Sequence, residues 1–223
     1  MVFRVKIVSP LKATGADLAR RQQRYSQAAH SKTRVKVDNL TGGPEALNSS
    51  GDILTSAAAI FDQGRNTSAH EWDAILIDCV FDPAVEELKE ATGLPTFGPT
   101  RVTLPLVSLV ASHFSIIARS QRQCELLAEL VELYVFGEAL CSLRALEISY
   151  EEAKQPEIFN QVMAVKLKEA VATDGAQAVM FGSTTMALTE EIRGAAQGKP
   201  LFLPGMVALE VMEQLWFGGR WPG

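Results

Sequence analysis

The stretch Asp73-Ala-Ile-Leu-Ile-Asp-Cys79 decides how this chain should fold, because a second stretch, Gln177-Ala-Val-Met-Phe-Gly-Ser183, repeats its pattern. Each is a short apolar run without alternation, which is typical of a strand buried on both faces of a parallel sheet. Each ends in a small side chain that bears sulfur or oxygen. The two ends, Cys79 and Ser183, are 104 residues apart in a chain of 223 residues. The repeat predicts two similar halves, each with a buried strand that delivers one reactive group to a shared site.

Strand-like and helix-like segments alternate around these two runs. The strands are expected at residues 2–9, 33–40, 73–79 and 94–98, and again at 114–118, 143–148, 177–182 and 200–203. The helices are expected at residues 15–29, 52–63 and 83–91, and again at 103–112, 121–135, 156–172 and 188–195. Strands separated by helices of this length indicate βαβ units. We therefore predict an α/β fold of two pseudo-symmetric lobes, each a four-stranded parallel sheet flanked by helices, with the active-site cleft between them.

The division between the lobes is expected at the Gly98-Pro99 turn. The first lobe would comprise residues 1–99 and the second residues 100–204. A final helix at about residues 206–216 is expected to return to the first lobe, which would then include residues 205–223 as well.

Ligands in open α/β sheets bind beyond the carboxyl ends of the strands. In this chain those positions hold polar or conformationally special residues, which we expect to line one cleft: Ser9, residues 39–44, Cys79, Gly98, Pro99, Arg119 and Ser183.

Cys79 is the first candidate for chemistry. Asp82 and Pro83 follow it, and these are favoured residues at the N-cap and first position of a helix. Free backbone N–H groups at a helix start lower the pKa of a thiol, so Cys79 is expected to be a proton shuttle or a nucleophile. On that interpretation iodoacetamide should label Cys79 before Cys124 or Cys141. The alternative is a buried structural thiol. The other two cysteines are expected to serve only packing, in the core or at the surface.

The second candidate is the turn Gly182-Ser183-Thr184-Thr185-Met186. Its hydroxyl and backbone N–H groups could cradle a carboxylate or an oxyanion, or Ser183 could simply cap the next helix. Arg119 could pair with a substrate carboxylate or form a surface salt bridge. Ser9 could offer its hydroxyl to the ligand or belong to an ordinary turn.

Composition excludes several classes of function. The net charge is −5 with no basic block, so no nucleic acid partner is expected. No apolar run reaches the ~20 residues of a membrane span. The three histidines have no partners at metal-ligand spacing, and no nucleotide-binding motif follows a strand, so neither a metal nor a cofactor is expected. The three widely spaced cysteines favour a reducing compartment, and we expect the cytoplasm.

Several short motifs occur in an order and spacing that is similar to a known family. They are Val8-Ser9-Pro10, Gly42-Gly43-Pro44, the Cys79 block with its Asp82-Pro83, Leu94-Pro-Thr-Phe-Gly98-Pro99, Ser142-Leu-Arg144-Ala145, and residues 169–186 around Ser183. Together they resemble the aspartate/glutamate/hydantoin racemase superfamily, most strongly its hydantoin and allantoin racemase branch. The resemblance covers nearly the whole chain, from about residue 3 to residue 215.

The resemblance implies chemistry without a cofactor. In that family one cysteine removes a proton from a carbon next to a carbonyl, and a second cysteine returns one on the opposite face. Amides and hydroxyls at the strand ends hold the enolate. Carried over to this sequence, the catalytic positions are Cys79 and Ser183. The substrate-binding positions are Ser9, Pro44, Val80, Gly98, Pro99, Arg119, Thr184 and Thr185.

The chain departs from the family where the second cysteine is replaced by Ser183. Two-base racemisation is therefore in doubt. The first hypothesis is a cofactor-independent isomerase (a racemase, epimerase, tautomerase or double-bond isomerase) that acts through Cys79 beside a carbonyl group. The alternatives are a decarboxylase with Cys79 as proton donor, a non-catalytic protein that binds a small acid, and an engineered Cys-to-Ser variant of a hydantoin or allantoin racemase.

The expected partner is a small carbonyl or carboxylate substrate. We also expect a homo-oligomer, since the aromatic C-terminal tail, from Leu215 onward, could bury against a second copy. The same tail could fold back on its own lobe.

Overall fold

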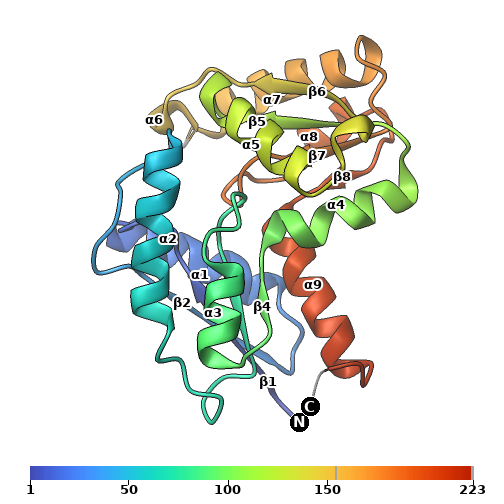
Figure 1. The fold of residues 1–223 in the computed structure, drawn as a ribbon. Coiled ribbons are helices and arrows are strands. Elements are labelled where there is room, and N and C mark those ends of the chain that lie inside the picture. Colours follow the sequence, from blue (N-terminus) through green and yellow to red (C-terminus); the bar gives the residue numbers. More distant parts are fainter. Residues whose placement is uncertain (154, 222–223) are drawn as a thin grey trace. The chain divides into compact units, whose positions relative to one another are not determined.

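Two four-stranded parallel sheets organise the computed structural model, which describes residues 1–153 and 155–221 (Figure 1). The first sheet has the order β2-β1-β3-β4 and is built from β1 (Phe3–Val8), β2 (Thr33–Asp38), β3 (Ala74–Ile77) and β4 (Thr96–Phe97). The second has the order β6-β5-β7-β8 and is built from β5 (Phe114–Ala118), β6 (Leu140–Ala145), β7 (Ala178–Phe181) and β8 (Leu201–Phe202). All six strand pairs are parallel. The α/β class and the two matching sheets are as predicted.

Helices connect the strands. They are α1 (Gly15–Ala28), α2 (Ser50–Gly64), α3 (Val85–Thr92), α4 (Pro99–Val110), α5 (Gln121–Leu133), α6 (Tyr150–Ala153), α7 (Pro156–Ala172), α8 (Glu190–Ala195) and α9 (Pro204–Phe217), with a short 3-10 helix at Gly137–Ala139. Four of these helices begin after a hydroxyl side chain that accepts a hydrogen bond from the backbone N–H three residues further on, which satisfies one of the free N–H groups of the first turn. These caps are Thr14, Ser49, Ser120 and Thr189. In the described part of the chain, no helix has the length and apolar character needed to cross a membrane.

The chain forms two compact units. One comprises residues 1–102 together with the segment from Gly205 onward, and the other comprises Thr103–Pro204. The division falls inside α4, a few residues after the turn at which the sequence placed it.

One part of the core of the first unit lies between its sheet and the helices α1 and α9. Alternate residues of β1, namely Phe3, Val5 and Ile7, are fully buried there against α1 and α9. The end of the chain closes over this core, since the Phe3 ring stacks on Trp216 with ring centroids 4.8 Å apart, and Trp221 stacks on Phe97 at 5.8 Å. The aromatic tail is therefore folded back onto its own unit, which was one of the two possibilities that the sequence left open.

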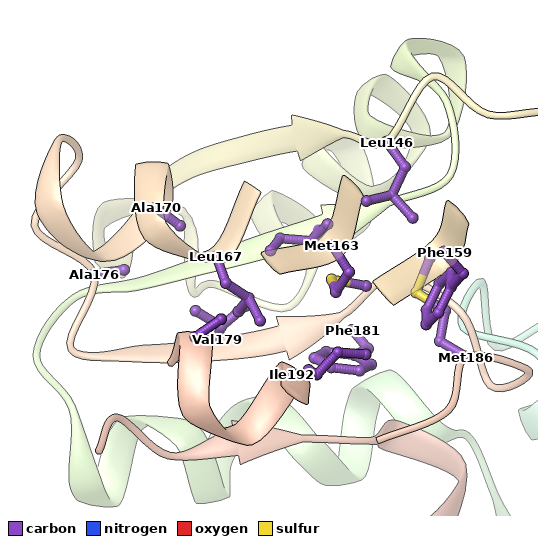
Figure 2. Packing of buried hydrophobic residues seen from close by; sticks show 12 residues of the cluster. Leu146, Phe159, Met163, Leu167, Ala170, Ala176, Val179, Phe181, Met186 and Ile192 are labelled. Carbon is purple, nitrogen blue, oxygen red and sulfur yellow. The ribbon is translucent and has the colours of Figure 1, made fainter. Parts of the chain in front are cut away.

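The second unit has an equivalent core. Residues of α7 and α8 cover β7 and β5, and Figure 2 shows Met163 and Leu167 of α7 directed toward Val179 and Phe181 of β7. Both strand residues have no exposed surface, as the unbroken apolar run of β7 predicted.

Two of the predicted elements begin three or more residues away from their expected start. Strand β6 begins at Leu140, three residues before the expected start, and it is the edge strand of its sheet with half-exposed side chains. Polar residues such as Ser142 are tolerated on an edge strand. They interrupt the apolar pattern, and the predicted strand therefore started too late. Helix α4 begins at Pro99 rather than at residue 103, because Pro99 occupies the first helical position, where a missing N–H has no cost.

Candidate functional site

Residues from three strand ends of the first sheet come to one edge. Val8 of β1 pairs with Ile77 of β3, and Leu76 pairs with Phe97 of β4. Ser9, Cys79 and Gly98 therefore leave neighbouring strands on the same side of the sheet. The ladder continues one step beyond the strands, because the Asp78 N–H donates to the Val8 carbonyl at 2.9 Å.

The second sheet brings Arg119 and Ser183 to its own carboxyl edge. Ile117 of β5 pairs with Phe181 of β7, and the Gly182 N–H donates to the Ile117 carbonyl at 2.7 Å. The residues that follow on the two strands are therefore neighbours. The Arg119 side chain is half-buried.

Cys79 and Ser183 occupy equivalent places in the two units. Each lies two residues after the end of its strand, and both strands are third in the order of their sheets. The repeat seen in the sequence is thus a repeat of topology, with a thiol in one unit where the other has a hydroxyl.

The surroundings of Cys79 contradict the expected lowering of its pKa. The residue is 4% exposed, and burial raises the pKa of its thiol well above the usual value. The Phe81 N–H lies 3.5 Å from Sγ and favours the thiolate, but this single long contact is outweighed. The physical reason is that no helix begins beside Cys79, since α3 starts only at Val85. Burial therefore favours the neutral thiol of Cys79 over the thiolate.

Asp82 does not cap the helix that follows it, which was the expectation. It adopts a left-handed backbone with φ of 49°, and its carboxylate accepts hydrogen bonds from the N–H groups of Thr100 at 3.1 Å and Arg101 at 2.7 Å. Asp82 thus caps α4, which begins at Pro99. A Cβ at Gly98 would collide with this carboxyl group, so glycine is needed there.

The Thr100 hydroxyl adds a further link by donating to the Val80 carbonyl at 2.6 Å. These bonds hold the loop after Cys79 against the start of α4, so Val80, Gly98 and Pro99 come together as one group.

The loops after β1 and β2 form a second group in the first unit. The Ser9 hydroxyl donates to the Leu11 carbonyl at 3.1 Å and lies fully buried in its own turn. The Asn39 side chain bonds both the N–H and the carbonyl of Ala13, each at 2.8 Å, which ties the two loops together. Pro44 follows in the loop that leads to α2 and is half-buried.

The Ser183 turn is closed by its own hydroxyls. Ser183 Oγ lies 2.9 Å from Thr185 Oγ1 and accepts from the Thr185 N–H at 3.2 Å. Thr184 is buried, and Thr185 is exposed. The expected helix start is absent, because α8 begins only at Glu190 and is capped by Thr189. The turn can therefore offer hydroxyls and turn amides to an anion, without help from a helix N-terminus.

Sequence reasoning missed a buried charged cluster directly behind Cys79. The Asp78 carboxylate has no exposed surface, pairs with the Arg21 guanidinium, and accepts from the Tyr25 hydroxyl at 2.7 Å. A signal was present in the sequence, because Asp78 is a charged residue inside a run that otherwise reads as buried strand, and buried charges need partners.

Arg144 of β6 is paired with Asp174 at 2.6 Å and with Glu169 at 2.6 Å, which gives this strand arginine a structural role. Among residues 1–153 and 155–221 no group of three or more His, Cys, Asp or Glu side chains is arranged to hold a metal ion.

Comparison with known proteins gives the family. The family model described as Asp/Glu/Hydantoin racemase matches residues 5–212, almost the whole chain. This chain belongs to that family. A hydantoin racemase from a Pseudomonas species is 24% identical over 207 residues, covering 92% of this chain and 82% of that protein.

Solved structures show the same fold. An allantoin racemase from Pseudomonas fluorescens superposes with a TM-score of 0.87 at 18% identity, covering 99% of this chain and 94% of that one. A maleate isomerase from Pseudomonas putida superposes with a TM-score of 0.68 at 14% identity, covering 97% and 94% of the two chains. Structures of arylmalonate decarboxylase are also similar. The same fold thus occurs in proteins named for three different reactions.

The Asp82 cap generates the first prediction. Asp82→Ala should lower the free energy of unfolding by about 1–2 kcal/mol, because two backbone N–H groups of α4 lose their acceptor. Asp82→Asn keeps one acceptor oxygen and should lose less. Urea unfolding followed by circular dichroism measures both. Equal stability of all three proteins would show that the cap does not form.

The burial of the thiols generates a second prediction, about the order in which the cysteines are labelled. Iodoacetamide should label Cys141, the exposed cysteine, before Cys79 and Cys124, which are buried. The pKa of Cys79 is raised, so its thiolate fraction at neutral pH is small. Mass spectrometry of the labelled peptides gives the order, and Cys141→Ser identifies the fast phase. Preferential labelling of Cys79 would contradict the buried, protonated thiol.

Proposed function

We propose that the protein is a cofactor-independent isomerase that acts on a carbon next to a carbonyl, with Cys79 as the residue that transfers the proton. The observation that carries the proposal is the placement of Cys79 at the carboxyl end of β3, in a chain that belongs to the Asp/Glu/hydantoin racemase family. The relatives named above act on hydantoin and allantoin, and this chain is proposed to act on a small carbonyl or carboxylate compound of that general kind.

The proposed reaction needs one thiol. In its ionised form Cys79 takes a proton from the carbon beside the carbonyl, and the C–H electron pair moves onto the carbonyl oxygen to give an enolate. The S–H proton then returns to the same carbon or to the far end of a conjugated system, and the enolate collapses. Return to the same face exchanges the hydrogen, while return to the far carbon moves a double bond.

In the second unit, the hydroxyls of Ser183 and Thr185, with Thr184 beside them, and the positive charge of Arg119 are proposed to bind a carboxylate or an oxyanion. The first unit would contribute the backbone of its loops to the substrate at Ser9, Pro44, Val80, Gly98 and Pro99.

One observation favours a second candidate, a decarboxylase. The pKa of the Cys79 thiol is raised by burial, so the resting group is a proton donor rather than a base. Loss of CO₂ from a malonate-type acid leaves the C–C electron pair on carbon, and a thiol then needs only to protonate it. The thiolate that results is neutralised by a proton from water.

The main test of both functions uses Cys79→Ala in D₂O. A panel of hydantoins, 2-substituted acids, cis-enoic acids and malonates is followed by NMR. The protein should incorporate deuterium at one carbon of an isomerase substrate without loss of mass, or release CO₂ from a malonate. Cys79→Ala should reduce either activity at least about a thousandfold, because the proton-transfer group is lost.

The pH dependence separates the two candidates. If the thiolate must act as base, kcat/KM should rise about tenfold per pH unit from neutral pH upward, because the pKa is raised. If the thiol only donates, kcat/KM should stay flat over the same range. Cys141→Ser serves as the matched control. Binding of a panel compound with neither exchange nor CO₂ release would instead indicate a non-catalytic protein.

The replacement of the second cysteine generates a further prediction. Ser183→Cys should add a second proton-transfer group at the equivalent place of the second unit and should give racemisation of a hydantoin from either enantiomer, which the parent should not show. The control Thr185→Cys places a thiol two residues away and should not. Chiral chromatography measures both. Equal racemisation by parent and Ser183→Cys would contradict the assigned role of position 183.

A further inference from the structure

The Asp78 carboxylate lies one residue before Cys79 and has no exposed surface, although the strand before it is apolar. It continues the alternation of Ala74 and Leu76, whose side chains belong to the core beneath α1. An apolar residue would suit this position, since burial of a charge is costly unless the charge is paired.

Helix α1 supplies the partners from a single face. Arg21 pairs with Asp78 Oδ2, and the Tyr25 hydroxyl donates to Oδ1 at 2.7 Å. Arg24 lies between them in sequence, with its Nη2 atom 3.9 Å from Oδ2. Arg21 and Tyr25 are themselves buried, and residues four apart on a helix project side by side. Each carboxylate oxygen thus has a donor, which is the requirement for a buried anion.

Stability alone does not account for this arrangement. Buried ion pairs are often no more stabilising than well-packed apolar side chains of similar size, whereas perturbed charged groups cluster at functional sites. The second unit has no charged residue at the equivalent position. At the place equivalent to Asp78 it has Gly182, which lies against Ala118 with no room for a side chain. The charged cluster therefore accompanies the thiol and not the hydroxyl.

We propose that the Arg21–Asp78–Tyr25 cluster is the positioning group for Cys79, which fixes the exit of the chain from β3 and sets the charge that the thiol experiences. The inference rests on the proposed function, because it assigns the cluster to the thiol that transfers the proton. The backbone supports it. The Asp78 N–H donates to the Val8 carbonyl, and the Cys79 N–H donates to the Ile77 carbonyl at 2.8 Å, so the chain turns at the anchored residue Asp78 itself.

The charges around Cys79 act in opposite directions. Asp82 and Asp78 raise the pKa of the thiol, and Arg21 lowers it, in addition to the large effect of burial. Arg24 adds a second positive charge near Asp78. Removal of the Asp78 charge should therefore favour the thiolate, and removal of the Arg21 charge should disfavour it.

The experiment measures alkylation of Cys79 by iodoacetamide over a pH series, in the full-length protein with Cys124→Ala and Cys141→Ala. Asp78→Asn should react about threefold to tenfold faster than the parent below the pKa of the thiol, and Arg21→Met should react slower by a similar factor. The range allows for the lower nucleophilicity of a less basic thiolate. The double variant should return toward the parent rate.

Opposite signs distinguish this role from a purely structural one. If the cluster only held the fold together, both single variants would loosen the site and both would react faster, and that result would overturn the proposal. If Arg21→Met fails to fold, the comparison of Asp78→Asn with the double variant still decides, because only a charge effect is reversed by the second substitution. Equal rates for these two variants would also overturn it.

A matched control lies at the other end of the same strand. Arg4 and Asp73 form an ion pair, with Nη2 and Oδ1 2.6 Å apart, before β3 begins. Asp73→Asn breaks a pair of the same type and should leave the alkylation profile unchanged.

The test needs no substrate, so its failure is separate from failure of the proposed function. If Cys79→Ala turns over substrate like the parent, while Asp78→Asn and Arg21→Met shift the alkylation rate in opposite directions, the proposed function is wrong and the role of the cluster holds. If Cys79→Ala is inactive, while Asp78→Asn alkylates at the parent rate, the proposed function holds and the role of the cluster is wrong.

Discussion

A carboxylate with no contact to water stays charged only if protein donors replace the water it has lost. Asp78 meets this condition because α1 presents Arg21 and Tyr25 to its two oxygens. The requirement couples the helix to the end of β3, since neither partner can move without leaving a buried group unpaired. The next residue is Cys79. The position of its thiol therefore depends on the ion pair that α1 makes with Asp78.

The two units have the same strand topology but carry different side chains at the equivalent position. Both sheets place their third strand so that the residue two beyond its end leaves the carboxyl edge. In the first unit that residue is a buried thiol, backed by an ion pair. In the second it is Ser183, in a turn closed by hydroxyls and preceded by a glycine. The two units therefore differ at this position by more than the exchange of sulfur for oxygen, because the surroundings of the two residues differ as well.

The sequence predicted the strands with unbroken apolar runs, because burial on both faces leaves no other pattern. Strand β5 and helix α7 were found at the expected residues. The prediction failed where a residue type that is favoured at a helix start instead contacts a segment distant in the sequence. Asp82 and Pro83 have the residue types of a helix start, but the carboxylate of Asp82 caps α4, whose N–H donors lie 18 and 19 residues further on. Local propensity carries no information about such a contact.

The same failure changed the interpretation of the site. The Phe81 N–H and the Arg21 charge favour the thiolate of Cys79, but burial outweighs them and raises the pKa of the thiol. Racemisation by two groups requires one base and one acid on opposite faces of the substrate. On the proposed function, the Cys79 thiol is uncharged before the substrate binds. The substrate would then either ionise the thiol on binding or generate its own carbanion, and loss of CO₂ is the simplest way to generate a carbanion.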